Sequence, residues 1–184
     1  MIHRDVTPSN IYLSKDGRVK LGDFGIARST SRMTMDDAEG ALPKGKFAYL
    51  SPEQIAAKPF DHRADLFSTA ACLAELLIGK RLFAGNGYLS ILLAIQECRL
   101  DTLWEAKDLI PPGLFQVLLL GLAKEPQERF QSASAFSAAL VPFQGDPIRA
   151  RAEVVRLVGR AYVSPFAAKG PFVVRDSATT MLSL

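Results

Sequence analysis

The chain has 184 residues, of which 48% are hydrophobic and 22% are charged, with a formal net charge of +3. This length and composition predict one globular domain with a sizeable buried core. The small positive charge lies mainly in residues 144–184 and forms no basic patch interleaved with aromatic side chains, which argues against a nucleic-acid partner.

A tight β-hairpin is the first predicted element. Two short apolar runs, Ile11–Leu13 and Val19–Leu21, flank residues 15–17, whose Lys-Asp-Gly sequence is typical of a turn between antiparallel strands. Such a hairpin brings Asn10 and Asp23 close together, because they lie at its two open ends.

A long loop and a buried helix are predicted next. The stretch up to ALPKGKFAYLSPE is rich in Ser, Thr, Gly and Met and has no sustained period, so we expect a long ordered or switchable loop. From Asp61, an N-cap candidate, apolar residues at 66, 70, 73 and 77 mark one face of a helix that Gly79 would end. The other faces of this helix are also apolar, which predicts that it is buried.

The remaining residues are predicted to be helical and then to form a tail. Further helices are expected at about 88–98, 113–124 and 132–140. Residues 144–184, with scattered arginines and a weak helical stretch around 148–160, are predicted to be a weakly structured tail or linker. The predicted fold is therefore mainly α with a short β-hairpin, in one domain over residues 1–143.

Three oxygen-bearing side chains have the pattern that phosphoryl transfer needs. This reaction requires a carboxylate beside the accepting hydroxyl and oxygen ligands for magnesium. Asp5 can orient the hydroxyl and accept its proton, while the Asn10 carbonyl and the Asp23 carboxylate can hold Mg²⁺ against the phosphates. The metal cofactor implied is Mg²⁺.

Five sequence blocks follow one another along the chain: HRDVTPSN, GDFG, GKFAYLSPE, RADLFSTAACLAELLIGKRLF and LAKEPQERFQSASAFSAAL. In this order they resemble the catalytic loop, the magnesium loop, the end of the activation segment, the central helix and the last conserved stretch of protein kinases. The chain thus resembles the C-terminal lobe of a bacterial, eukaryotic-type Ser/Thr protein kinase over about residues 1–143. The resemblance implies transfer of the ATP γ-phosphate to Ser or Thr hydroxyls of a protein substrate.

The resemblance also implies roles for individual residues. Asp5 would be the catalytic base, and Asn10 and Asp23 would be ligands of the metal on the nucleotide. Asp65 would accept backbone amides of the catalytic loop, or else would be an exposed acid at the start of a helix. The other implied residues are Arg4, which would receive an activation-loop phosphate; His3 and Phe24, which would stack beneath the active site; Gly25, which completes DFG; and Glu53 with Arg129, a buried ion pair.

Two residues depart from the pattern of Ser/Thr kinases. Thr7 stands where the family normally has a lysine that touches the transferred phosphate, and a Thr hydroxyl cannot supply that charge. Lys46 stands where the family usually has Thr, so the two positions look exchanged. We expect the Lys46 ammonium to reach toward Asp5 and replace the missing cation; the alternative is a solvated loop lysine.

Four loop hydroxyls are candidate phosphorylation sites because they lie close in sequence to Arg28 and Arg32. A phosphate on one of them could pair with Arg4 and order the loop, although such hydroxyls are often only solvated. The candidates are Ser29, Thr30, Ser31 and Thr34.

Parts of a complete kinase are not found in this sequence. A kinase binds ATP with a Gly-rich loop, a lysine on a strand and a glutamate on a helix. None of these three elements precedes His3 in the given sequence. We therefore expect activity to require an N-terminal lobe from an upstream segment or a separate chain, and the isolated chain to be inactive. Two alternatives stay open: a catalytically inactive, pseudokinase-like binding platform, and a non-functional gene fragment.

Other classes of site and location are disfavoured by the sequence. Cys72 and Cys98 have no CxxC or Cys/His spacing, so neither a disulfide framework nor a zinc site is expected. No signal peptide or membrane span is found, which predicts a cytoplasmic protein. The tail arginines are expected to be a solvated face, with a membrane-surface role as the alternative.

Overall fold

A computed structural model of the chain describes residues 2–24 and 46–163, except for the side chains of residues 46, 162 and 163. The chain divides into two compact units. Unit 1 comprises Met1–Thr7 and Phe24–Pro142, and unit 2 comprises Pro8–Asp23 and Phe143–Leu184. The described residues are mostly helical with one two-stranded antiparallel sheet, which confirms the coarse fold class predicted from the sequence.

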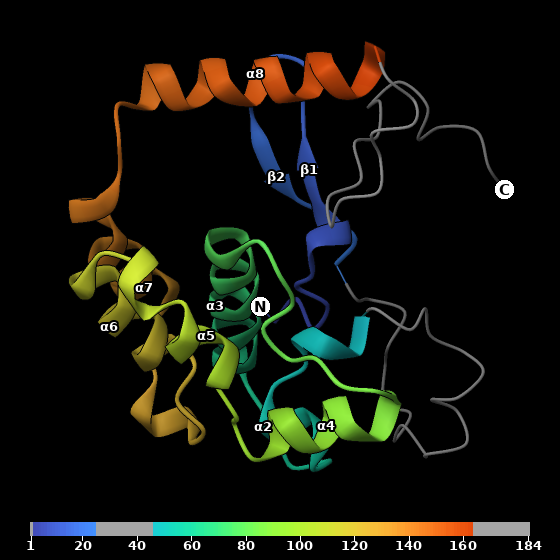
Figure 1. Cartoon of the computed structure of the whole chain (residues 1–184). Helices are drawn as coiled ribbons and strands as arrows, with labels where there is room; N and C mark the ends of the chain where they lie inside the picture. The colour runs from blue at the N-terminus through green and yellow to red at the C-terminus, as the bar shows by residue number, and fades with distance from the viewer. Residues whose placement is uncertain (1, 25–45, 164–184) are drawn as a thin grey trace, which may run out of the picture. The chain divides into compact units, whose positions relative to one another are not determined.

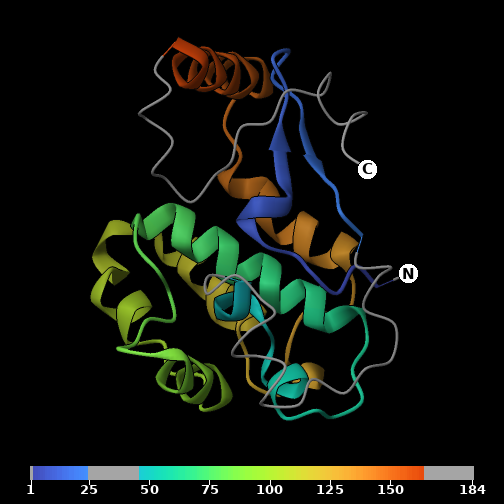
Figure 2. The ribbon, with the colours of Figure 1, turned by 90° about the vertical axis from the view of Figure 1, so that its right-hand side faces the viewer.

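Helices build unit 1 (Figure 1). They are α2 (Pro52–Ile55), α3 (His62–Ile78), α4 (Tyr88–Gln96), α5 (Asp101–Glu105), α6 (Pro112–Gly121) and α7 (Ala133–Leu140), with the 3-10 turns η2 (Lys46–Tyr49), η3 (Lys107–Leu109), η4 (Pro126–Glu128) and, at the boundary with unit 2, η5 (Val141–Phe143). The longest of these, α3, runs through the middle of the unit and packs against α6 and η2 (Figure 2).

The predicted start and end of α3 are confirmed. The Asp61 side chain accepts a hydrogen bond from the Arg63 backbone N–H at 2.9 Å and so caps the helix. Gly79 ends it in the left-handed conformation at φ 70°, which glycine adopts without a steric cost. Ala70 of α3 is fully buried against Gly121 of α6. The two helices are so close here that a Cβ added to Gly121 would lie 2.7 Å from the Ala70 Cβ.

The last turn of α3 is less buried than predicted. Leu77, expected on the buried face, is 40% exposed, and its neighbour Leu76 is 51% exposed. The close contact with α6 is made at Ala70, two turns earlier. An apolar sequence pattern reports which residues could be buried, but the packing of neighbouring helices decides which of them are.

The shorter helices differ from prediction at their ends. α4 stops at Gln96 because Cys98 adopts a left-handed φ of 54°, which a helix cannot continue through. α2 and α5 were not predicted, since four or five residues are too few to show a helical period. None of the described helices is long and apolar enough to cross a membrane.

Unit 2 contains the predicted hairpin. After the 3-10 turn η1 (Pro8–Asn10), strands β1 (Ile11–Leu13) and β2 (Val19–Leu21) pair antiparallel, with Tyr12 opposite Lys20. The Gly17 N–H donates to the Ser14 carbonyl at 2.9 Å to close the turn. Gly17 has φ 78°, in the left-handed region that favours glycine.

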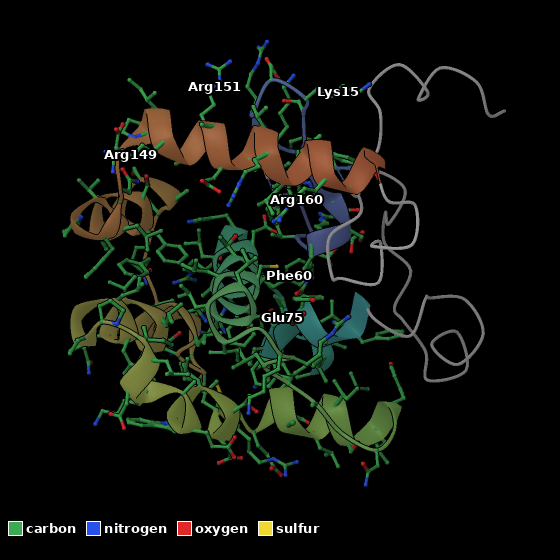
Figure 3. All side chains as sticks on the ribbon, turned by 45° about the horizontal axis from the view of Figure 1, so that its top comes forward. Lys15, Phe60, Glu75, Arg149, Arg151 and Arg160 are labelled. Carbon is green, nitrogen blue, oxygen red and sulfur yellow. The ribbon has the colours of Figure 1, made fainter. Side chains whose placement is uncertain are left out.

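The second element of unit 2 is helix α8 (Pro147–Val163), which crosses the turn of the hairpin (Figure 1). It is longer than the weak helical stretch predicted around residues 148–160. The Arg151 side chain, labelled in Figure 3, donates from Nε to the Asp16 carbonyl at 2.7 Å. Long-range contact with the hairpin thus supports a helix whose own sequence signal is weak.

Replacing Gly17 with Ala is expected to loosen α8 from the hairpin. An added Cβ would lie 2.6 Å from the Arg151 carbonyl oxygen, and the left-handed φ would cost a further 1–2 kcal/mol, approximately. Hydrogen exchange of residues 147–163 should accelerate by about 5- to 30-fold. The control is Gly145→Ala, where a Cβ meets open space; equal protection in both variants would contradict the close contact.

Candidate active site

Residues 2–7 form the part of unit 1 that carries Asp5. The Asp65 carboxylate, in the first turn of α3, accepts hydrogen bonds from the backbone N–H groups of His3 at 2.7 Å and Arg4 at 2.8 Å. Arg4 has a left-handed φ of 69°, which costs a non-glycine residue about 1–2 kcal/mol. Two bonds to a carboxylate offset that cost and hold the loop on α3.

A ring contact supports the same loop. His3 is buried, and its ring lies 4.5 Å from the Phe24 ring at a tilt of 43°. The Asp5 backbone N–H donates to His3 Nδ1 at 3.4 Å. The two rings are thus in contact in a tilted arrangement, and the backbone of Asp5 is tied to the His3 ring.

Changing Asp65 to Asn is expected to release residues 3 and 4. The amide keeps one acceptor oxygen but places an NH₂ group against a backbone N–H, so one charge-assisted bond of about 1.5–3 kcal/mol is lost. Exchange of the His3 and Arg4 amides should accelerate by about 10- to 100-fold in NMR measurements. The control, Asp61→Asn, keeps a good N-cap and should leave these amides unchanged.

Unit 2 brings the two predicted metal ligands to one end of the hairpin. The Gly22 backbone N–H donates to the Asn10 backbone carbonyl at 2.9 Å. This bond extends the strand pairing by one step beyond the pair Ile11 and Leu21. Asp23 follows directly and has a left-handed φ of 55°. Non-glycine residues in this conformation are uncommon and occur often at functional sites.

Tyr12 is a residue of this region that the sequence interpretation missed. Its hydroxyl donates to the Asp23 carboxylate oxygen Oδ2 at 2.6 Å. The ring lies over Gly22, where a Cβ would be 2.6 Å from Tyr12 Cε2. The signal was available, because a residue opposite Lys20 in an antiparallel pair has Gly22 as its diagonal neighbour on the same face.

The ion pair of Glu53 and Arg129 fastens α2 to the segment after η4. Two guanidinium nitrogens of Arg129 donate to the two Glu53 carboxylate oxygens at 2.8 Å each, in a buried setting. Burial, the largest single contribution, raises the Glu53 pKa. The hydrogen bonds and charge of Arg129, together with hydrogen bonds from the Glu53 backbone and from Ser51, outweigh it, so the pKa is lowered. Glu53 and Arg129, which the family resemblance implies as a buried ion pair, are thus paired in the structure.

A second buried polar cluster was not predicted. The Tyr49 hydroxyl donates to the Glu75 carboxylate at 3.0 Å, and Arg81 donates to the Tyr49 hydroxyl at 2.9 Å. Burial and the neighbouring Glu75 charge raise the Tyr49 pKa, so the phenol stays protonated. The Ser68 hydroxyl also donates to the Tyr49 carbonyl at 2.6 Å, so this cluster anchors η2 on α3, where Figure 3 labels Glu75.

A sequence profile described as "Protein kinase domain" matches residues 1–141. The chain belongs to the protein kinase family. Its similarity to bacterial kinases of the eukaryotic type, inferred above from five sequence blocks, is confirmed by relatives from several bacteria.

Three kinases illustrate this similarity. The tyrosine-protein kinase MasK of Myxococcus xanthus is 38% identical over 143 residues, which are 78% of this chain and 22% of MasK. The probable serine/threonine-protein kinase PknB of Corynebacterium glutamicum is 37% identical over 144 residues, 76% of this chain and 22% of PknB. The serine/threonine-protein kinase PknL of Mycobacterium tuberculosis is 35% identical over 140 residues, 76% of this chain and 35% of PknL. The chain thus spans about a fifth to a third of the length of these relatives.

Several predicted kinase residues fall outside the described part of the chain. The side chain of Lys46 is among them, so the replacement of the cation missing at Thr7 by Lys46 stays a prediction. Thr7 itself is buried, with 3% of its surface exposed. The others are Gly25, Ser29, Thr30, Ser31 and Thr34.

The donor atoms at the hairpin end suit a magnesium ion. Mg²⁺ prefers oxygen ligands and is usually held by one or two carboxylates together with substrate phosphates. The Asn10 side chain, which is buried, carries an amide oxygen. Asp23 carries a carboxylate whose Oδ2 accepts the Tyr12 hydrogen bond. Among the described residues no cluster of three or more His, Cys, Asp or Glu side chains that could hold a metal ion occurs.

Proposed function

We propose that this kinase chain transfers the γ-phosphate of ATP to Ser or Thr hydroxyls of a protein substrate. The observation that carries the proposal is the match to the protein kinase domain over residues 1–141, which includes every proposed catalytic side chain. Relatives named as serine/threonine kinases support Ser or Thr as the acceptor.

Three side chains have distinct roles in the proposed reaction. Asp5 orients the acceptor hydroxyl and takes its proton as the bond to phosphorus forms. Asn10 and Asp23 hold Mg²⁺, which neutralises charge on the phosphates when bound. Asn10 follows Asp5 by five positions, so a fully extended chain limits the distance between their Cα atoms to about 18 Å.

The proposed division of labour places this chain in the C-terminal lobe. Residues 1–143 supply the acceptor base and the metal ligands in this proposal, and residues 144–184, which include α8, follow them. In this proposal turnover also requires an N-terminal lobe that binds ATP through a Gly-rich loop and a lysine. Arg4 would pair with a phosphorylated loop hydroxyl, and Lys46 would supply the cation that Thr7 lacks.

The experiment is transfer of ³²P from labelled ATP to a protein substrate, by a form of the protein that includes an N-terminal lobe. Acid hydrolysis of the product should release phosphoserine or phosphothreonine. Release of phosphotyrosine alone would overturn the acceptor class, and absence of transfer by a folded, ATP-binding preparation would overturn the activity.

A catalytically inactive binding platform is the second candidate. Burial of Thr7 favours it, because this position carries no cation and little of the side chain reaches solvent. In that case the folded protein would bind its protein partner without transferring phosphate, with or without Mg²⁺.

A further inference from the structure

We propose that Tyr12 is a positioning residue: its hydroxyl fixes the Asp23 carboxylate for a divalent cation, and Gly22 is required because it gives the Tyr12 ring room to do so. This inference rests on the proposed function, which makes Asp23 a metal ligand. It adds two residues, on β1 and directly after β2, that set the affinity of the site.

The geometry joins three neighbouring residues of unit 2. The Tyr12 hydroxyl reaches Asp23 Oδ2 at 2.6 Å, a short bond of the kind expected between a hydroxyl and a carboxylate. The ring crosses from β1 over Gly22, and a Cβ at position 22 would meet Tyr12 Cε2 at 2.6 Å. Any residue other than glycine would therefore push the ring away from Asp23.

The bond matters because Asp23 is exposed and lies in a left-handed conformation. An exposed carboxylate can rotate among several orientations. Binding a cation fixes one of them, and the side-chain entropy lost in doing so weakens binding. A neutral donor on Oδ2 selects one orientation of the Asp23 carboxylate. Loss of such a hydrogen bond to a ligating carboxylate typically lowers metal affinity by about 10- to 100-fold.

Two variants test the contribution of the Tyr12 hydroxyl and the position of the Tyr12 ring separately. Tyr12→Phe keeps a ring over Gly22 but removes the donor. Gly22→Ala keeps the donor but displaces the ring. If the hydroxyl acts through Asp23, each change should weaken cation binding, and the double variant should bind no more weakly than the worse of the two.

The test uses Mn²⁺ as the probe and the whole 184-residue chain. Mn²⁺ broadens NMR signals of nearby backbone amides, so titration can be followed at residues 10, 12 and 22–24 without measuring phosphate transfer. We expect Tyr12→Phe and Gly22→Ala to need about 10-fold or more Mn²⁺ for half-maximal broadening. The matched control, Tyr88→Phe on α4, removes a hydroxyl in unit 1 and should bind as the unchanged chain does.

Asp23→Asn distinguishes failure of this inference from failure of the proposed function. If Asp23→Asn weakens Mn²⁺ broadening while Tyr12→Phe does not, the role of Tyr12 is overturned and the metal assignment stands. If Asp23→Asn leaves broadening unchanged, both are overturned. A purely structural role for Tyr12 predicts a lower melting temperature with unchanged Mn²⁺ affinity, which would also overturn the inference.

Discussion

Replacement of Arg129 by Met is expected to lower the free energy of unfolding by about 3–5 kcal/mol, enough to unfold a marginally stable domain. The side chain is fully buried and all five of its N–H groups have acceptors. Two go to Glu53, and three go to the carbonyls of Arg63, Ala123 and Lys124 at 2.7–3.1 Å. Methionine would leave the Glu53 carboxylate and three carbonyls buried without these donors.

Burial decides the size of this effect, and a second arginine provides the control. Arg63 also pairs with a carboxylate, that of Asp61 at 2.8 Å, but the Asp61 side chain is 44% exposed. Because water screens such a pair, Arg63→Met should cost no more than about 1 kcal/mol. Chemical denaturation of both variants gives the comparison, and equal losses would contradict the dominant role of the buried pair.

The pH dependence provides an independent test of the same ion pair. The Glu53 pKa in the folded chain is below the ordinary value of 4.5. The unfolded chain therefore binds the proton more tightly, so the stabilisation is fully present above about pH 4.5 and is lost as the pH falls through the lowered pKa. Glu53→Gln should remove this part of the acid destabilisation, measured as the change of melting temperature below pH 4.5.

Local elements of this fold follow from the sequence because their chemistry is local. The hairpin depends on the Lys-Asp-Gly turn at residues 15–17, and α3 depends on Asp61 and Gly79, which lie at its ends. The extent of α8 could not be predicted in this way. Its contact through Arg151 joins residues 135 positions apart in the chain.

Contacts between side chains that are far apart in the sequence could be predicted only through the resemblance to protein kinases. Glu53 and Arg129 are 76 residues apart, and no spacing rule selects this pair among the acids and bases of the sequence. Tyr12 was overlooked because it was counted as one apolar residue of a strand. The register of the hairpin makes Gly22 its diagonal neighbour, but its contact with Asp23 also depends on the space above Gly22, which only the folded hairpin shows.

Replacement of Asp5 by Asn is expected to slow phosphate transfer by about 10²- to 10⁴-fold, the usual contribution of a positioned acid or base. The amide can still orient the acceptor hydroxyl but cannot take its proton. Mn²⁺ broadening at Asn10 and Asp23 should remain, because in the proposed reaction Asp5 acts on the acceptor hydroxyl and not on the metal. Initial rates at saturating ATP, with the N-terminal lobe present, measure the effect.

The pattern across variants separates proton transfer from metal binding. Asp5→Asn should lower kcat with little change in the Mg²⁺ requirement, whereas Asp23→Asn should raise the Mg²⁺ concentration needed for half-maximal rate. Asp101→Asn, at an exposed position that begins α5, controls for the loss of one negative charge. An Asp5→Asn protein that retained the full rate would exclude Asp5 as the base, and the acceptor would then have to lose its proton without help from this carboxylate.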